Sequence, residues 1–427
     1  AYRFHRIALP DDHDNIVAIE DSREKDDSMA VLVSDGSRTF HISGDEKITP
    51  SHRQIQPNHF QAPLPEDLSI LRKPVEVVSA TFKDHGDNLW VGYRNSGFQV
   101  ISQNLIAYKK ANDNPLAKAT KGMAMLCMAA VGNHLLAGTA LQVFIYDLQN
   151  RRIGQIPFRN IFDSVPAPQK INLNNIVKYD DEHAWMVSGH QVASCRISDE
   201  CADVLHKSPV LKSLLGYGLK VGDALYVCSE GGKLLRFRFD NLQPDTIPVP
   251  SAYYDHETKM EKLADGNILL FMQGMHLAIL SPKTGKIKEM KVAGMPEYGN
   301  FDPAFAKLDS YGMVWLGTKR DGLYLIDMKR KSMRSAKVLN DTHIEGMVED
   351  RNRQLWVTTM RDAFFVTSKS KVFMMNGLLS ASQDRDDWQF YNNSICLSPD
   401  GDVVFGSSMG CKFMPQEAMY TDFMQTP

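Results

Sequence analysis

Short apolar runs, each introduced by a cluster of Asp, Asn or Gly, recur along almost the whole chain. In the clearest copy, Asp309 to Asp327, turn residues precede Met-Val-Trp-Leu-Gly-Thr, and a second glycine, Gly322, precedes Leu-Tyr-Leu-Ile. Asp, Asn and Gly favour tight turns because they tolerate left-handed backbone or bond their own backbone. A short apolar or alternating run after such a turn is typical of a buried strand. The pattern therefore predicts a repeated strand–turn–strand unit.

The repeat has a period of about 45 residues, which accommodates the four short strands and turns of one propeller blade. One large residue near the centre of each unit marks nine copies. Successive markers lie between 41 residues (Trp185 to Tyr226) and 58 residues (Leu32 to Trp90) apart. The nine markers are Leu32, Trp90, Leu136, Trp185, Tyr226, Leu270, Trp315, Trp356 and Val404.

A closed ring is expected because each unit has a hydrophobic face that only its neighbour can bury. We predict an all-β β-propeller over residues 1–415 with seven to nine four-stranded blades, the lower number applying if the weak N-terminal copies belong to a neighbouring ring. The Trp markers should then pack between blades. Helix signals are sparse, and the stretch from Pro115 to Met128 is the one helical candidate.

Charge and composition narrow the class of protein. The chain has 427 residues, 43% of them hydrophobic, and a formal net charge of −3. A nearly neutral chain with scattered basic residues has no bulk attraction for nucleic acid or for an anionic membrane. No apolar run reaches the roughly 18 residues that span a bilayer, and residues 1–4 do not begin a signal-peptide core. We therefore expect no nucleic acid partner and no direct membrane contact in this region.

Six cysteines are scattered along the chain without a C-x-x-C pair or a neighbouring His cluster, so a zinc site is not expected. Five fall in or beside apolar strand patterns, which favours buried free thiols. Cys201 is expected in a loop, which leaves a Cys195–Cys201 disulfide open as an alternative.

Motifs for common chemistry are absent. The sequence has no P-loop, no nucleophile elbow, no dinucleotide-binding glycine motif and no H-E-x-x-H. The run Asp255-His256-Glu257 is interpreted as a solvated turn, since adjacent residues on a strand point to opposite faces. We predict no catalytic residues, no metal and no cofactor for this region.

The repeat resembles a known family. Asp309 to Asp327, Asp84 to Ile101 and Asp350 to Val366, where Thr358 replaces glycine, are similar to the two-component regulator propeller repeat, with its pattern Asp-x-x-Gly-x-Leu-Trp-Val/Leu-Gly-Thr. Asp400 to Pro415 is similar to the family's last blade. The resemblance implies that residues 416–427 are a linker toward an immunoglobulin-like domain beyond Pro427.

The resemblance also implies a function. Such propellers form the periplasmic ectodomain of inner-membrane hybrid histidine kinases, which sense oligosaccharides and switch on polysaccharide-utilisation genes. The expected partners are an oligosaccharide and, through the rest of the receptor, a second copy of the chain. The alternative is a propeller-fold polysaccharide lyase or hydrolase, for which no converging catalytic set can be placed from the sequence.

A ligand site is expected where the loops of all blades converge at the ring axis. Polar residues follow each strand that carries Gly-Thr, and two aromatic residues stand in a non-repeating stretch before the last unit. These residues suit an acidic oligosaccharide if they converge, and are otherwise ordinary hairpin turns. The candidates are Arg94, Asn95, Lys319, Arg320, Asp321, Arg361, Asp362, Trp388 and Tyr391.

Overall fold

A computed structural model describes most of the chain. The described residues are 18–21, 31–34, 38–43, 47–53, 77–83, 88–94, 97–101, 103–164, 173–295, 302–340, 342–360, 363–366, 372–374 and 389–415. Contacts divide the chain into two compact units, one of residues 112–414 and one of residues 1–111 with 415–427. The sequence predicted one propeller over 1–415, with the alternative that the weak N-terminal copies belong to a neighbouring ring; the contacts assign the first two of the nine repeat units to the unit of residues 1–111.

In the described part of residues 112–414 there are seven antiparallel sheets, in each of which neighbouring strands are consecutive in sequence. The first four sheets comprise β8 (Cys127–Val131), β9 (His134–Gly138), β10 (Gln142–Asp147) and β11 (Arg152–Pro157); β12 (Leu173–Lys178), β13 (His183–Ser188), β14 (Val192–Ser198) and β15 (Cys201–Lys207); β16 (Leu215–Val221), β17 (Ala224–Ser229), β18 (Lys233–Arg238) and β19 (Asp245–Pro248); and β20 (Lys259–Lys262), β21 (Ile268–Phe271), β22 (Leu277–Leu280) and β23 (Ile287–Met290).

The last three sheets complete the unit. They comprise β24 (Pro303–Leu308), β25 (Met313–Thr318), β26 (Leu323–Asp327) and β27 (Ser332–Ser335); β28 (Ile344–Glu349), β29 (Leu355–Thr359), β30 (Ala363–Val366) and β31 (Val372–Met374); and β32 (Phe390–Leu397), β33 (Val403–Ser407) and β34 (Gly410–Met414).

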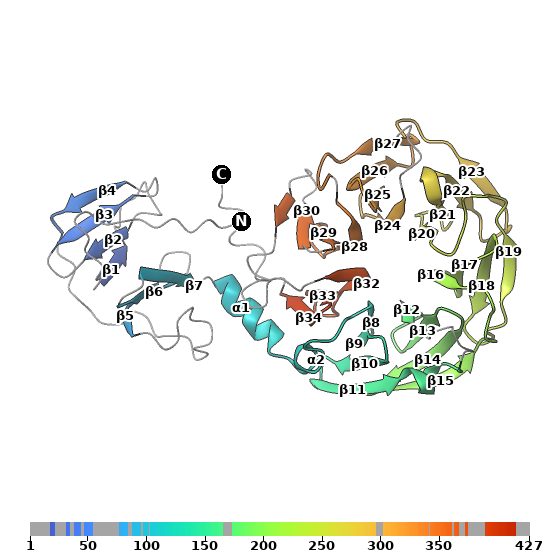
Figure 1. Ribbon diagram of the computed structural model, residues 1–427, viewed down its shortest axis with the longest axis horizontal. Helices are drawn as coiled ribbons and strands as arrows, with labels where there is room; N and C mark the ends of the chain where they lie inside the picture. Colours follow the sequence, from blue (N-terminus) through green and yellow to red (C-terminus); the bar gives the residue numbers. More distant parts are fainter. Residues whose placement is uncertain are drawn as a thin grey trace. The chain divides into compact units, whose positions relative to one another are not determined.

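The first strand of each sheet lies nearest the ring axis (Figure 1). These first strands contact one another in the order β8, β12, β16, β20, β24, β28 and β32, and β32 contacts β8 again. The predicted propeller fold is confirmed. The predicted number of blades is not: six sheets of this unit have four strands, fewer than the seven to nine four-stranded blades expected, and the seventh, β32–β34, has three among the described residues.

The outer edge of β34 is covered by side chains and a short helix. The Asn112 side-chain amide donates to Phe413 O (2.8 Å), and its Oδ1 accepts from Phe413 N (2.9 Å). Cys411 N donates to Thr120 Oγ1, and α2 (Pro115–Ala119) contacts β34. The segment that leads into the first sheet therefore satisfies backbone groups that a fourth strand would otherwise bond.

The Asp of the sequence motif caps a turn and holds the Trp. Asp309 Oδ1 accepts from the backbone N–H groups of Tyr311 and Met313, and its Oδ2 accepts from Trp315 Nε1 at 2.8 Å. Asp350 bonds Trp356 Nε1 in the same way at 3.0 Å. One carboxylate thus satisfies the turn and the only polar atom of a buried indole, which explains the spacing of six residues between them.

Three of the four Trp markers, Trp185, Trp315 and Trp356, pack between blades as predicted. Trp185 is fully buried in a cluster with Leu215 and Leu225 of the next blade, and Trp315 packs with Ile344 of the next blade. Trp356 packs edge-on against Phe405, with ring centroids 5.9 Å apart.

The glycine of Gly-Thr gives room for the next blade. A Cβ on Gly317 would lie 2.5 Å from Ile344 Cγ2, and one on Gly138 would lie 2.5 Å from Leu173 Cδ2. Both contacts join the end of a second strand to the start of the next blade's first strand. The glycine therefore sets how closely neighbouring blades approach.

Two sheets lie in the described stretches of the unit of residues 1–111. They are β1 (Ala18–Asp21), β2 (Val31–Ser34), β3 (Thr39–Ile42) and β4 (Ile48–Ser51), and β5 (Val78–Lys83), β6 (Leu89–Tyr93) and β7 (Gly97–Ile101). Each of the nine sequence markers lies on the second strand of its sheet, which confirms the repeat.

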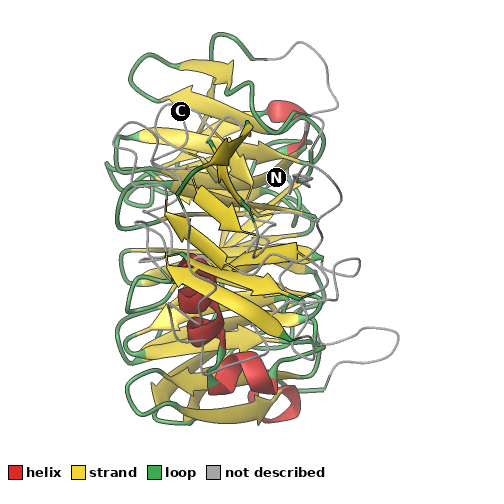
Figure 2. Ribbon diagram, turned by 90° about the vertical axis from the view of Figure 1, so that its left-hand side faces the viewer, coloured by secondary structure: helices red, strands yellow, loops and turns green. Residues whose placement is uncertain are grey.

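Helices are few, as Figure 2 shows. Among the residues that the structure describes, they are α1 (Gln103–Asn112), which the sequence did not predict, α2, α3 (Phe158–Ile161) and the short 3₁₀ helix η3 (Gln273–Met275). No helix among the described residues is long and apolar enough to cross a membrane. All six cysteines are free, and Cys201 begins β15 rather than lying in a loop.

Replacement of Gly317 tests this packing. We expect Gly317→Ala to lower the free energy of unfolding by about 1–3 kcal/mol, because the methyl group overlaps Ile344 at an interface between blades. Gly189→Ala is the matched control, since its Cβ would meet only Leu214 Cδ2 at 3.9 Å. Equal stability of the two variants in urea denaturation would contradict this account.

Candidate functional site

One face of the ring collects the start of every first strand. In an antiparallel sheet, the start of the first strand and the hairpin between the second and third strands share an edge. Backbone hydrogen bonds join these edges between neighbouring blades: Leu215 N to Gly189 O, Phe390 N to Met360 O and Met125 N to Ser407 O. We name this the front face; its segments are 123–126, 139–141, 189–191, 208–214, 230–232, 249–258, 272–276, 302, 319–322, 342–343, 360, 389 and 408–409.

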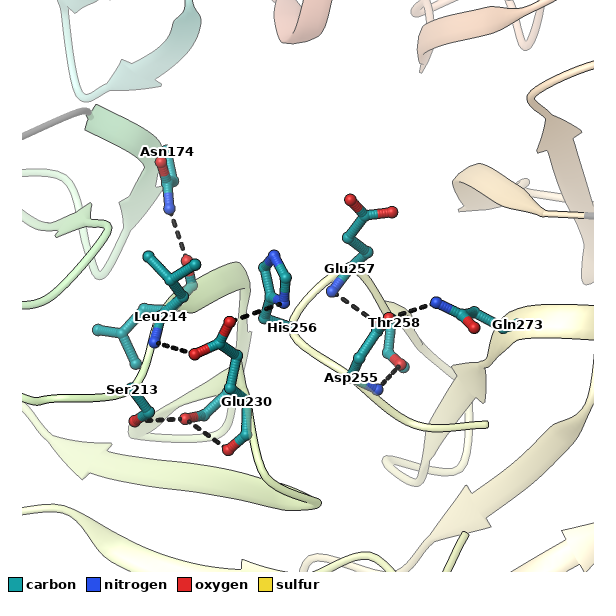
Figure 3. Close-up of polar contacts among 11 residues, drawn as sticks. Asn174, Ser213, Leu214, Glu230, Asp255, His256, Glu257, Thr258 and Gln273 are labelled. Carbon is teal, nitrogen blue, oxygen red and sulfur yellow. Dashed lines mark hydrogen bonds and ion pairs between the residues drawn. The ribbon is translucent and has the colours of Figure 1, made fainter. Parts of the chain in front are cut away.

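A polar network orders three neighbouring strand starts on the front face (Figure 3). The Asn174 amide donates to Leu215 O at 2.6 Å, and Leu214 N donates to Glu230 Oε2 at 3.1 Å. Glu230 Oε1 lies 3.9 Å from His256 Nδ1. The network therefore runs from the start of β12 through β16 to the turn before β20.

That turn comprises residues 255–258. Glu257 N donates to Asp255 Oδ1, and Asp255 N donates to Thr258 Oγ1. The turn predicted from the sequence is thus correct, but its residues are not merely solvated. In Figure 3 the Glu257 carboxylate points away from the network, and its Oε2 accepts from Lys319 Nζ at 2.7 Å. The hydrogen bond from Lys319 holds the pKa of Glu257 below its usual range.

Three further titratable side chains lie beside this pair: Lys259, which begins β20, and His343 and Glu345 at the start of β28. Glu345 is 6% exposed, and its Oε1 lies 3.7 Å from His343 Nε2. Burial raises the pKa of Glu345 to about 7, although the nearby Lys259 opposes the shift. Burial lowers the pKa of Lys259, and burial with the charges of Lys319 and Lys259 lowers the pKa of His343.

A register shift recurs at the start of the first strands. The ladders of β12, β16, β24, β28 and β32 each skip at least one residue there. The skipped residues include Asn174, Tyr217, Glu345 and Tyr391. A bulge turns a side chain away from the regular alternation and is common beside binding sites. Here it gives polar and aromatic residues positions that the sheet ladder does not use.

Aromatic side chains accompany the polar groups. Tyr217 and Phe305, from β16 and β24, meet edge-on with ring centroids 6.5 Å apart. Tyr253 stacks on His276 with centroids 3.5 Å apart, and Tyr253 is 47% exposed on the front face. The front face therefore presents the exposed ring of Tyr253 stacked on an imidazole.

The predicted site residues are only partly brought together. Lys319, Arg320 and Asp321 lie in one front-face hairpin, and Tyr391 lies in β32, two blades away. Asp321 N donates to Thr318 Oγ1, the bond that closes the hairpin, and Asp321 Oδ2 accepts from Tyr324 Oη. Arg320 is exposed.

The remaining candidates do not join this group. Arg94 is exposed at the end of β6 in the other unit. Asn95, Arg361, Asp362 and Trp388 lie outside the described residues. Of the basic residues expected to form a ring around the axis, Lys319 is the one that the described residues place beside the other polar groups. Its charge is compensated by Glu257.

The titratable groups that meet at the starts of β20 and β28 were not predicted from the sequence. Glu257 was assigned to a solvated turn, and Lys259, His343 and Glu345 were not singled out. A usable signal was present: charged residues lie at the start of β20 and β28, whereas the first strands of the other blades in this unit begin with uncharged residues. Their neighbours come from other blades, so their convergence is not a local property of the sequence.

The chain matches no family model and no curated protein sequence. Solved structures with the same fold include the extracellular domain of a B. thetaiotaomicron protein described as a hybrid two-component system, with a TM-score of 0.55 and 12% identity over 94% of this chain and 51% of that one. They also include the extracellular domain of a one-component system of that organism (TM-score 0.52, 12% identity, 93% and 52%). A third is virginiamycin B lyase from Staphylococcus aureus (TM-score 0.53, 12% identity, 69% and 94%).

At these identities the likeness shows the β-propeller fold. The structural neighbours include extracellular domains of two-component systems, in line with the resemblance seen in the repeat. The chain spans about half the length of those extracellular domains.

The raised pKa of Glu345 predicts a pH dependence of stability. Between about pH 4.5 and 7, the unfolded chain ionises Glu345 while the folded chain keeps its proton. The folded state then binds more protons, so this group's contribution to stability falls as pH rises through that window.

We therefore expect wild type to lose stability relative to Glu345→Gln from about pH 4.5 to 7, and the difference to stay constant above pH 8, measured by urea denaturation. His343 is present in both proteins, so its own titration cancels to first order. A difference between the two proteins that does not change from pH 4.5 to 7 would refute the raised pKa.

Proposed function

We propose that this chain is the ligand-sensing propeller of a periplasmic two-component receptor, and that it binds an oligosaccharide at the front face of residues 112–414. The observation that supports this proposal most strongly is that five titratable side chains from three blades converge on this face: Glu257, Lys319, Lys259, His343 and Glu345. Burial of Lys259, His343 and Glu345 at this position disfavours their charged forms, and the sheet ladders require none of these side chains.

The chemistry of the face supports a sugar ligand. Carboxylate, amide and imidazole groups offer acceptors and donors in fixed directions, which matches the hydroxyl groups of a sugar ring. Tyr253 adds an exposed ring, and Tyr217, whose ring meets Phe305 edge-on, adds a partly buried one. Concave loop clusters with a few converging polar groups are the usual ligand sites of such folds.

The signalling role rests on the repeat and on the structural neighbours. The motif Asp309 to Asp327 and the extracellular domains of similar fold both point to a receptor ectodomain. In this proposal the bound oligosaccharide changes the activity of a kinase in the rest of the receptor, a second copy pairs with it there, and polysaccharide-utilisation genes respond.

An enzyme is the second candidate. Paired acid–base groups with shifted pKa values, such as Glu345 and Lys259, are found at catalytic centres as well as at binding sites. One structural neighbour is a lyase. A polysaccharide lyase or hydrolase would convert its ligand, which a sensor would not.

A binding screen tests the proposal. Calorimetry with neutral, uronic-acid and sulfated oligosaccharides should find at least one ligand for the wild type. We expect Lys319→Met to weaken its binding about tenfold or more, since it removes a front-face donor and releases Glu257. Lys283→Met, in the β22–β23 hairpin at the opposite edge of its sheet, should change binding less than twofold.

Three results would contradict the proposal. Equal binding by wild type and Lys319→Met would place the site elsewhere. Binding to no oligosaccharide in the panel would refute the ligand class. New reducing ends or unsaturated products after incubation would favour the enzyme.

A further inference from the structure

Lys259, His343 and Glu345 form an unusual group within the front face. They come from two first strands that are separated by β24, and they interact electrostatically with one another. Among the described residues, Lys259 makes no ion pair, whereas the neighbouring Lys319 is paired with Glu257. The group therefore contains a lysine without an ion-pair partner, whose charged form is disfavoured by burial, beside a carboxyl whose charged form is also disfavoured by burial.

Two of the three polar groups lack a close partner. His343 Nε2 is buried and has no hydrogen-bond partner in the structure. Glu345 is 6% exposed, and its Oε1 lies 3.7 Å from His343 Nε2, which is beyond hydrogen-bond distance. Buried polar groups left without partners cost free energy, and their presence at the ring axis points to a ligand that supplies the missing bonds.

The donors in this group favour an anion. Lys259 can donate from its ammonium, neutral His343 can donate from Nε2, and a protonated Glu345 can donate from its carboxyl. A cationic ligand group would be repelled by Lys259 and Lys319. A hydroxyl group would leave the charge of Lys259 unneutralised, whereas a carboxylate would pair with it and accept from the other two.

We propose that Lys259, His343 and Glu345 together seat an anionic group of the ligand, a sugar carboxylate, and that Glu345 takes up a proton from solvent when this group binds. The inference rests on the proposed function, because it names the ligand class and the contact residues of the same site. We call Lys259, His343 and Glu345 the anion seat, or seat. The charged and titratable groups that face it are Glu257, Lys319 and Cys228 of β17.

The proton uptake has a defined sign. An anion beside Glu345 disfavours the ionised carboxylate and stabilises the protonated form. Since the pKa of Glu345 is raised to about 7 in the free protein, roughly half a proton per site should be taken up at pH 7. Affinity should therefore rise as pH falls from 8 to 6, approaching tenfold per pH unit at the upper end of this range.

Glucuronate and glucose are the paired probes, because they differ at the carboxylate. We expect NMR titration to show wild type binding glucuronate at least tenfold more tightly than glucose, and calorimetry in phosphate and Tris buffers to show proton uptake. Lys259→Met should lose this preference. Glu345→Gln keeps a donor, so it should bind glucuronate within about threefold of wild type but with no proton uptake from this position.

Glu349→Gln, at the far end of the same strand, is the matched control and should behave as wild type. The seat is refuted if glucuronate binds no better than glucose, if Lys259→Met keeps the preference, or if Glu345→Gln keeps the full proton uptake. Oligosaccharide binding with no dependence on Lys259 would refute the seat and leave the proposed function standing. Glucuronate binding that needs Lys259, with no oligosaccharide bound, would support the seat and refute the sensor's proposed ligand.

Discussion

Each blade of the ring can bury its two faces only against its neighbours, and the rest of the structure depends on how closely those neighbours approach. The approach is set where the second strand of one blade meets the first strand of the next, as at Gly317 and Ile344. It also fixes where the start of each first strand lies relative to the hairpin of the preceding blade. The front face is therefore a consequence of inter-blade packing, and its polar groups converge because the ring closes.

Ring closure uses polar side chains as well as apolar packing. The last sheet has three strands among the described residues, and its outer edge is completed by the amide of Asn112 and the hydroxyl of Thr120. These residues precede the first sheet of the ring in sequence, so their hydrogen bonds to β34 join the beginning of the unit to its end. Since β32 also contacts β8, removing either end would expose strand edges and apolar faces together.

Local features of the fold could be read from the sequence. The turn residues, the apolar runs and the Asp–Trp spacing all lie within a few residues of one another, and each of the nine markers is on the second strand of its sheet. The number of complete blades and the division into two units could not be predicted, because they depend on which sheets pack together. The helix α1 was missed, since Gln103 to Asn112 has a weak amphipathic pattern and no acidic residue in its first turn.

The site was predictable only in outline. The sequence predicted that the site lies at the hairpins that follow Gly-Thr, and Lys319 was found in this way. The Thr318 hydroxyl donates to Gly322 O and so stabilises that hairpin. Glu257, His343 and Glu345 come from other blades and, in the case of Glu345, from a bulge that the strand pattern does not reveal. The repeat pattern predicts the strands and turns within one blade. It does not predict which side chains of different blades meet at the axis.

The central claim is that ligand binds the front face of residues 112–414. Hydrogen–deuterium exchange of this protein, with and without a saturating oligosaccharide identified by calorimetry, tests it most directly. The account predicts slower exchange in the front-face segments 213–216, 255–259, 318–322 and 342–346, with no change in the opposite hairpins 148–151, 199–201 and 309–313. Protection confined to the opposite hairpins, or to residues 1–111, would contradict it.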